Sequence, residues 1–119
     1  MADFPKRRDV WTARLDPTIG SEIKKTRPVV IISNNINNQF SSLVSILPVS
    51  GKGTKTYPFE VLIPEGSSGL SKPSKIRCQQ IRTIDKERLV KKLGVVDKNL
   101  IMAIEEALKL HLGMDGGEL

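Results

Sequence analysis

Arg27 stands where a polar, charged loop meets an apolar, β-branched run, which is a common place for chemistry. The loop, residues 16–26, opens with an Asp-Pro pair, and a second proline follows Arg27 directly. Proline fixes φ and keeps its predecessor out of a helix, so both loop ends are defined. The apolar run at 29–32 predicts a strand that is covered on both faces. By itself this stretch favours the plainer interpretation, a surface loop with an ordinary surface arginine.

Other polar residues extend the set that suits a phosphodiester. Glu22 and Lys24 share the loop with Arg27, and Ser50 and Arg77 join them if their strands are neighbours. Arginine matches phosphate in a bidentate fork and stays charged, so it can stabilise a pentavalent phosphorane. It is a poor general base, and that task falls to Glu22 or to a water. Such a site needs no metal if the substrate supplies its own nucleophile, as the 2′-hydroxyl of RNA does.

Several other chemistries lack their residues. A metal site needs clustered His, Cys or carboxylate, and the chain has one histidine and one cysteine, far apart. His111 falls in the expected C-terminal helix and is more typical of a helix residue than of a catalyst. The segment 51–55 lacks the spacing and the following helix of a phosphate-binding loop. We therefore expect no metal and no cofactor.

Length and composition predict one globular domain over residues 1–119. The hydrophobic content is 39% and the charged content 27%, and no apolar run approaches the ~20 residues of a membrane-spanning helix. The first residues do not resemble a signal peptide, and a lone cysteine, Cys78, suits a reducing cytoplasm. The net charge of +6 favours a polyanion or an acidic protein tail as partner.

The hydrophobic pattern predicts a mainly β protein with a C-terminal helix (α+β). We expect strands at 9–15, 29–33, 43–49, 57–63, 74–84 and 90–96, with a bulge or bend in the long fifth one. Pro48 cannot donate to a ladder and predicts a sheet edge or bulge. The asparagine-rich segment 34–38 is turn-like, and 85–89 is a short helical turn capped by Asp85. The helix begins after Asp97 and ends near Gly113. These elements favour a small barrel of mostly antiparallel strands.

Short motifs, in order from about residue 7 to 113, resemble the MazF/PemK/Kid family of toxin endoribonucleases. They are DVW at 9–11, DP with GSE at 16–22, RPVV at 27–30, NN at 34–35, YPFEV at 57–61 and QIRTIDK at 80–86, followed by RL and LG. No single motif is specific, but the ordered set is. With this resemblance, a functional interpretation of Arg27 replaces the plainer one.

The resemblance implies an SH3-like, CcdB/MazF-like barrel that forms a homodimer and cleaves single-stranded RNA without metal. It further implies attack by the 2′-hydroxyl, giving a 2′,3′-cyclic phosphate and a 5′-hydroxyl, and inhibition by an acidic-tailed, MazE-like antitoxin. The catalytic arginine of the family falls on Arg27, its threonine on Ser50, and its loop glutamate on Glu22. Its substrate-binding positions are expected at Arg7, Asn34, Arg77, Gln79 and Gln80.

The chain departs from the family pattern at three positions. Ser50 keeps the hydroxyl of the family threonine but lacks the methyl that restricts χ1. Gln79 replaces the aspartate of the Kid branch and cannot act as a base. Arg8 stands where the family usually has glycine, and it is either a phosphate contact beside Arg7 or a tolerated surface residue.

Plainer explanations stay open for the remaining positions. Arg77 can pair with a carboxylate across the sheet, and Gln79 and Gln80 can be strand residues with solvated amides. Trp11 falls in the apolar phase of its strand, which favours a core position over base stacking.

The alternative function is a non-enzymatic binder on the same barrel, either a CcdB-like gyrase inhibitor or an RNA-binding protein. The gyrase inhibitors rely on an aromatic residue at the C-terminal tip, and residues 114–119 hold none and resemble a frayed tail.

Overall fold

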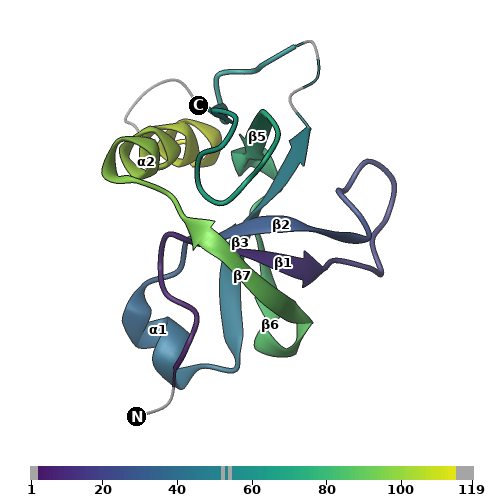
Figure 1. Cartoon of the computed structure of the whole chain (residues 1–119), viewed down its shortest axis with the longest axis vertical. Helices are drawn as coiled ribbons and strands as arrows, with labels where there is room; N and C mark the ends of the chain where they lie inside the picture. Colours follow the sequence, from purple (N-terminus) through teal and green to yellow (C-terminus); the bar gives the residue numbers. More distant parts are fainter. Residues whose placement is uncertain (1–2, 52, 54, 115–119) are drawn as a thin grey trace.

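The computed structural model describes residues 3–51, 53 and 55–114 (Figure 1). The strands are β1 (Asp9–Arg14), β2 (Thr26–Ile31), β3 (Leu43–Gly51), β4 (Glu60–Ile63), β5 (Ser74–Arg77), β6 (Arg82–Asp85) and β7 (Leu89–Val95). The helices are α1 (Asn35–Phe40) and α2 (Lys98–Leu112), and two 3₁₀ turns are η1 (Cys78–Gln80) and η2 (Lys86–Arg88). The expected C-terminal tail (115–119) and two residues of the basic loop (52 and 54) lie outside the described residues.

The strands form one bent antiparallel sheet in the order β4-β5-β3-β2-β1-β7, with β6 also paired to β3. Over the described residues the two end strands, β4 and β7, do not pair, so the sheet is an open, barrel-like structure. This confirms the expected mainly β fold with mostly antiparallel strands and a C-terminal helix. No helix in the described part of the chain is long and apolar enough to cross a membrane.

The central strands β2 and β3 are covered on both faces, as the apolar run at 29–32 predicts. Val29 and Ile31 pack in one core cluster, with β1 and β6 residues, while Val30 packs in the other, with α2. All three side chains are fully buried. Successive strand residues point to opposite faces, so an unbroken apolar run requires a core on each side.

Helix α2 has the predicted ends and the predicted buried stripe. The Asp97 carboxylate caps it by accepting the Leu100 N–H at 2.8 Å, and Gly113 ends it with a φ of 69°. Ile101 and Ile104 turn inward, and α2 lies across the β4 end of the sheet (Figure 1). The helix thus closes the core on the side away from the β1–β2 loop.

The expected strand 74–84 is interrupted, and the prediction of one strand was wrong, although the bend was predicted. β5 pairs with β3 at 49–51 and β6 pairs with β3 at 43–46, and η1 lies between them. Pro48, opposite this gap, has no N–H to offer a ladder. β3 is therefore central rather than an edge strand, and the proline sits where its partner turns away.

Two further segments differ from expectation. Residues 35–40 form α1 instead of a turn, because the Asn34 side chain caps the helix by accepting the Asn37 N–H at 2.8 Å. Buried Asn38 also donates to the Ser33 carbonyl at 2.8 Å. β4 begins at Glu60 rather than at 57, because the Glu60 N–H donates to the Tyr57 carbonyl in a turn.

Candidate functional site

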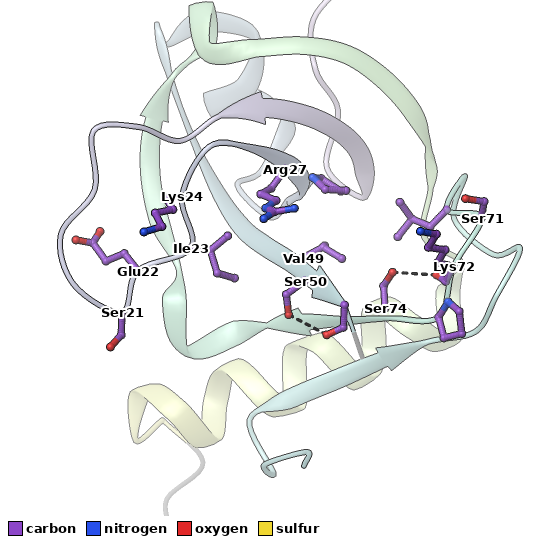
Figure 2. A pocket seen from close by; sticks show the side chains of 14 residues that line it. Ser21, Glu22, Ile23, Lys24, Arg27, Val49, Ser50, Ser71, Lys72 and Ser74 are labelled. Carbon is purple, nitrogen blue, oxygen red and sulfur yellow. Dashed lines mark hydrogen bonds between the residues drawn. The ribbon is translucent and has the colours of Figure 1, made fainter. Parts of the chain in front are cut away.

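A surface pocket of about 630 Å³ opens where the β1–β2 loop, the end of β3 and the segment before β5 meet (Figure 2). Arg27 lies above Val49 and Ser50, loop residues 21–24 lie on one side, and residues 71–74 form the opposite wall. The cationic side chains on its lining are Lys24, Arg27 and Lys72. The pocket therefore presents positive charge around a serine hydroxyl.

Arg27 enters the pocket from the second position of β2, where it is the register partner of Ala13 on β1. The strand thus fixes its backbone, while its side chain is exposed. Among the ion pairs formed by the described residues, none includes Arg27. Its guanidinium is therefore available to an anion from solution.

Ser50 lies in the same pocket, one residue before the end of β3, and is half-buried. Its Oγ accepts a hydrogen bond from Arg77 Nε at 2.9 Å and donates to the Gly51 carbonyl at 3.2 Å. The expectation that Ser50 and Arg77 come from neighbouring strands agrees with the β3–β5 pairing.

Arg77 and Gln79 both donate to Glu60, a β4 carboxylate that is fully buried. Arg77 Nη1 lies 3.1 Å and Gln79 Nε2 2.7 Å from Glu60 Oε2. Burial raises the pKa of Glu60, but hydrogen bonds from the Tyr57 N–H and Gln79, with the charges of Arg77 and Lys75, lower it further, and the net pKa lies below its ordinary value. Glu60 is thus held as a carboxylate, and Arg77 makes the cross-sheet ion pair that the plainer explanation predicts.

The loop carboxylate, Glu22, points away from Arg27 and Ser50 (Figure 2). Its Oε1 accepts the Ile19 N–H of the same loop at 2.8 Å. The next residue, Ile23, donates its N–H to Gln80 Oε1 at 2.8 Å, which ties the loop to η1. A smaller cavity of about 240 Å³, bordered by Gln79 and Gln80, adjoins the main pocket at residues 22 and 23.

The structure does not bring Arg7 or Asn34 to this pocket. Arg7 donates to Glu105 of α2 at 2.9 Å and to the Ile32 carbonyl at 3.2 Å. Asn34 uses its side chain as the cap of α1. Both residues therefore serve contacts within the fold.

Sequence reasoning missed the far wall of the pocket and the buried carboxylate that binds Arg77. Lys72, with Ser71 and Ser74, comes from a Gly/Ser/Pro-rich segment whose composition predicts only a loop between two strands. Its one usable signal is a lysine just before the strand that pairs with Ser50. Glu60 is the single charge in an apolar strand, and such a charge signals a buried ion pair across the sheet.

The described side chains that line the pocket are those that bind phosphate, and they do not form an acidic cluster. Within residues 3–51, 53 and 55–114, no three His, Cys, Asp or Glu side chains gather closely enough to hold a metal ion. A guanidinium, two ammonium groups and several serine hydroxyls surround a cavity that fits several atoms of a nucleotide backbone. This donor set binds a phosphate and stabilises added negative charge on it.

Known proteins are similar to this chain in sequence and in fold. Residues 6–112 match the PemK-like, MazF-like toxins of type II toxin–antitoxin systems. The chain is 36% identical to endoribonuclease MazF9 of Mycobacterium tuberculosis, over 92% of this chain and 97% of that protein. It is 37% identical to endoribonuclease EndoA of Bacillus subtilis, over 92% and 95% of the two chains. A solved mycobacterial endoribonuclease in complex with its cognate antitoxin superimposes with a TM-score of 0.78 at 24% identity, covering 92% of this chain and 96% of that one.

Proposed function

The chain belongs to the PemK-like, MazF-like toxins of type II toxin–antitoxin systems, and we propose that it is an endoribonuclease that cleaves single-stranded RNA. The observation that carries the proposal is Arg27, whose guanidinium lines a cationic pocket beside the Ser50 hydroxyl. Two relatives named as endoribonucleases, aligned over almost their whole length, favour this function over a non-enzymatic binder.

In the proposed reaction the substrate supplies the nucleophile. The 2′-oxygen of the ribose forms a bond to the neighbouring phosphorus, and the bond from phosphorus to the 5′-oxygen of the next nucleotide breaks. The 2′-hydroxyl loses its proton to a base, and the leaving 5′-oxygen takes up a proton from a water molecule. The products are a 2′,3′-cyclic phosphate and a 5′-hydroxyl, and no step requires a metal ion.

Arg27 and Ser50 take the catalytic roles in this proposal. The fixed charge of Arg27 stabilises the extra negative charge that develops on the phosphorane oxygens. The Ser50 hydroxyl, which now donates to a carbonyl, donates to a phosphate oxygen when RNA binds. Water takes the 2′ proton, because the Glu22 carboxylate accepts a hydrogen bond of its own loop and points away.

The bases on either side of the cleaved bond lie along the adjoining walls of the pocket. Gln79 and Gln80 border the smaller cavity, where their amides are placed to contact a base. Arg7 and Asn34 are left out of the proposed substrate site, because their side chains are used by α2 and α1.

We expect the toxin to act in the cytoplasm as a homodimer that an antitoxin holds inactive. The solved mycobacterial relative is described as bound to its cognate antitoxin. An acidic antitoxin tail complements the net charge of +6 and the cations of the pocket. Exposed apolar side chains on both helices, Ile36, Phe40 and Met102, offer surface for a second copy or an antitoxin.

The test is the substitution Arg27→Ala, assayed on a defined single-stranded RNA with the cut ends sequenced. We expect the cleavage rate to fall at least about a hundredfold, the loss typical of removing one donor to a developing oxyanion. Because Arg27 is exposed, the free energy of unfolding, measured by thermal denaturation, should change by less than about 0.5 kcal/mol.

The matched control is Arg14→Ala, which removes an exposed arginine of β1 that does not line this pocket. This variant should cleave at the rate of the unmodified protein. Cleavage by Arg27→Ala at a comparable rate would overturn the assignment of the site. Activity that disappears in EDTA, or persists on RNA with a 2′-deoxy sugar at the cut, would contradict the proposed chemistry.

A further inference from the structure

Glu60 gathers four hydrogen-bond donors although its side chain is fully buried. The Tyr57 N–H, at 3.0 Å, and Lys75 Nζ, at 3.4 Å, donate to Oε1. Arg77 and Gln79 donate to Oε2. A carboxylate has about four acceptor sites, so this one is fully used and its orientation is fixed.

The fixed carboxylate also fixes Arg77. Glu60 and Arg77 are register partners on β4 and β5, which brings Arg77 Nη1 onto Glu60 Oε2. A guanidinium is planar and rigid, so holding Nη1 sets the direction of the Nε–H. That N–H points at Ser50 Oγ, 2.9 Å away.

A serine needs such a partner, because without a β-methyl group its hydroxyl has three staggered rotamers. The hydrogen bond from Arg77 occupies one lone pair of Oγ and favours a single rotamer. It also leaves the hydroxyl proton for another acceptor, at present the Gly51 carbonyl.

We propose that Glu60, acting through Arg77, is a positioning residue that holds the Ser50 hydroxyl as a directed donor into the pocket. This inference rests on the proposed RNA cleavage for its catalytic meaning, but not for its structural meaning. Glu60 touches no solvent and takes no part in proton transfer. Arg77, with 30% of its side chain exposed, donates to the Ser50 hydroxyl and is not among the described residues that line the pocket.

The first experiment measures the Ser50 χ1 angle in solution from NMR couplings between its α and β protons. The unmodified protein should show one rotamer. Arg77→Met, which keeps the alkyl stem and removes both donors, should show rotamer averaging, as should Glu60→Gln. The matched control is Lys75→Met, which takes a cation from Glu60 but none from Ser50, and it should keep one rotamer.

The second experiment separates positioning from substrate binding with a double-mutant cycle on RNA cleavage. Arg77→Met should lower kcat roughly tenfold with little change in KM, because misplacing a catalytic group can cost up to about a hundredfold. The same substitution in a Ser50→Thr background should cost much less, since threonine restricts its own χ1.

The outcomes distinguish this inference from the proposed function. A single, unchanged Ser50 rotamer in Arg77→Met overturns the inference even if RNA is cleaved, and so does an equal loss of kcat in both backgrounds. An effect on KM alone also overturns it, because it makes Arg77 a substrate contact. Rotamer averaging in a protein that cuts no RNA supports the positioning network and contradicts only the proposed function.

Discussion

Arg8 is a non-glycine residue in a backbone conformation that suits glycine. Its φ is 83°, in the left-handed region that favours glycine. Its Nε and Nη2 both donate to the Val96 carbonyl, at 3.0 and 2.8 Å. These bonds join the start of β1 to the chain before α2 and offset the strain. Arg8 is therefore a structural residue rather than a phosphate contact.

Lys72, on the far wall of the pocket, is predicted to contact a backbone phosphate of bound RNA. Lys72→Ala should weaken binding and reduce the slope of log affinity against log salt by about 0.7, the value for one phosphate contact on a single strand. The measurement is fluorescence anisotropy at several salt concentrations, using RNA with a 2′-deoxy sugar at the cut site so that it stays intact.

The control for Lys72 is Lys91→Ala, which removes an exposed lysine of β7 that does not line the pocket. It has the same change in net charge, so it corrects for the field of the whole molecule. Equal slopes in the two variants would show that Lys72 contributes only through net charge.

At the scale of elements, the segment that carries Lys72 is fastened to β7 by two glycines. A Cβ on Gly69 would lie 2.1 Å from the Leu93 carbonyl oxygen, and one on Gly94 would lie 2.6 Å from that of Ser68. Main chain therefore packs directly on main chain, and Gly69 also has a φ of 80°. This contact sets the position of the far wall.

Gly94→Ala should lower the free energy of unfolding by about 1–3 kcal/mol, the usual cost of overpacking. The backbone atoms it meets belong to Ser68 and Gly69, which lead into the wall, so cleavage of RNA should weaken as well. Urea denaturation measures the first effect. Gly51→Ala is the control for the stability measurement alone, because its Cβ meets nothing within 4 Å. A stability loss of equal size in both variants would mean that the close contact is not its cause.

The elements that were predicted correctly are those whose pattern reflects burial. The unbroken apolar run of β2 predicts burial on both faces, and the apolar stripe of α2 predicts burial on one. Both predictions are confirmed by the two core clusters. α1 was missed because an asparagine-rich run is typical of a turn, although the bonds that cap and fasten this helix are local. The bend in 74–84 was predicted, but not that it breaks the strand at 78–80, because that depends on the distant strand β3. Buried Asn38 bonds back to Ser33, and the gap opposite Pro48 exists only once β3 has partners.

The same distinction holds for the site. Arg27 and Ser50 follow from their place at strand ends and from the family resemblance, and the structure puts them on one pocket. The wall with Lys72 and the charge on Glu60 depend on how β4 and β5 fold over β3. No local pattern states which loop closes a pocket or which donors converge on a buried carboxylate.

At the scale of the whole molecule, Glu60 should couple stability to pH. Its pKa in the folded protein lies below its ordinary value of 4.5, so its contribution is present above about pH 4.5 and is lost as the pH falls towards the folded pKa. Glu60→Gln should be less stable at pH 7 by about 3 kcal/mol, because it leaves buried Lys75 and partly exposed Arg77 without their charge partner. Denaturation in urea should show this difference narrowing below about pH 4.5.

Glu106→Gln is the control for this pH series, since its carboxylate is 76% exposed. It should follow the unmodified protein at every pH. A gap between Glu60→Gln and the unmodified protein that stays constant down to acid pH would contradict the assigned charge state.

The glycine seam at residues 69 and 94 also bears on how such a protein can diverge. The segment that leads into the far wall is attached to β7 through main chain at these two glycines, while the wall side chains that line the pocket, Ser71 and Lys72, are exposed. We expect that replacing them changes which RNA the pocket accepts and leaves the fold intact. Descendants of this chain can therefore acquire new cleavage preferences by single substitutions without first having to recover a lost fold.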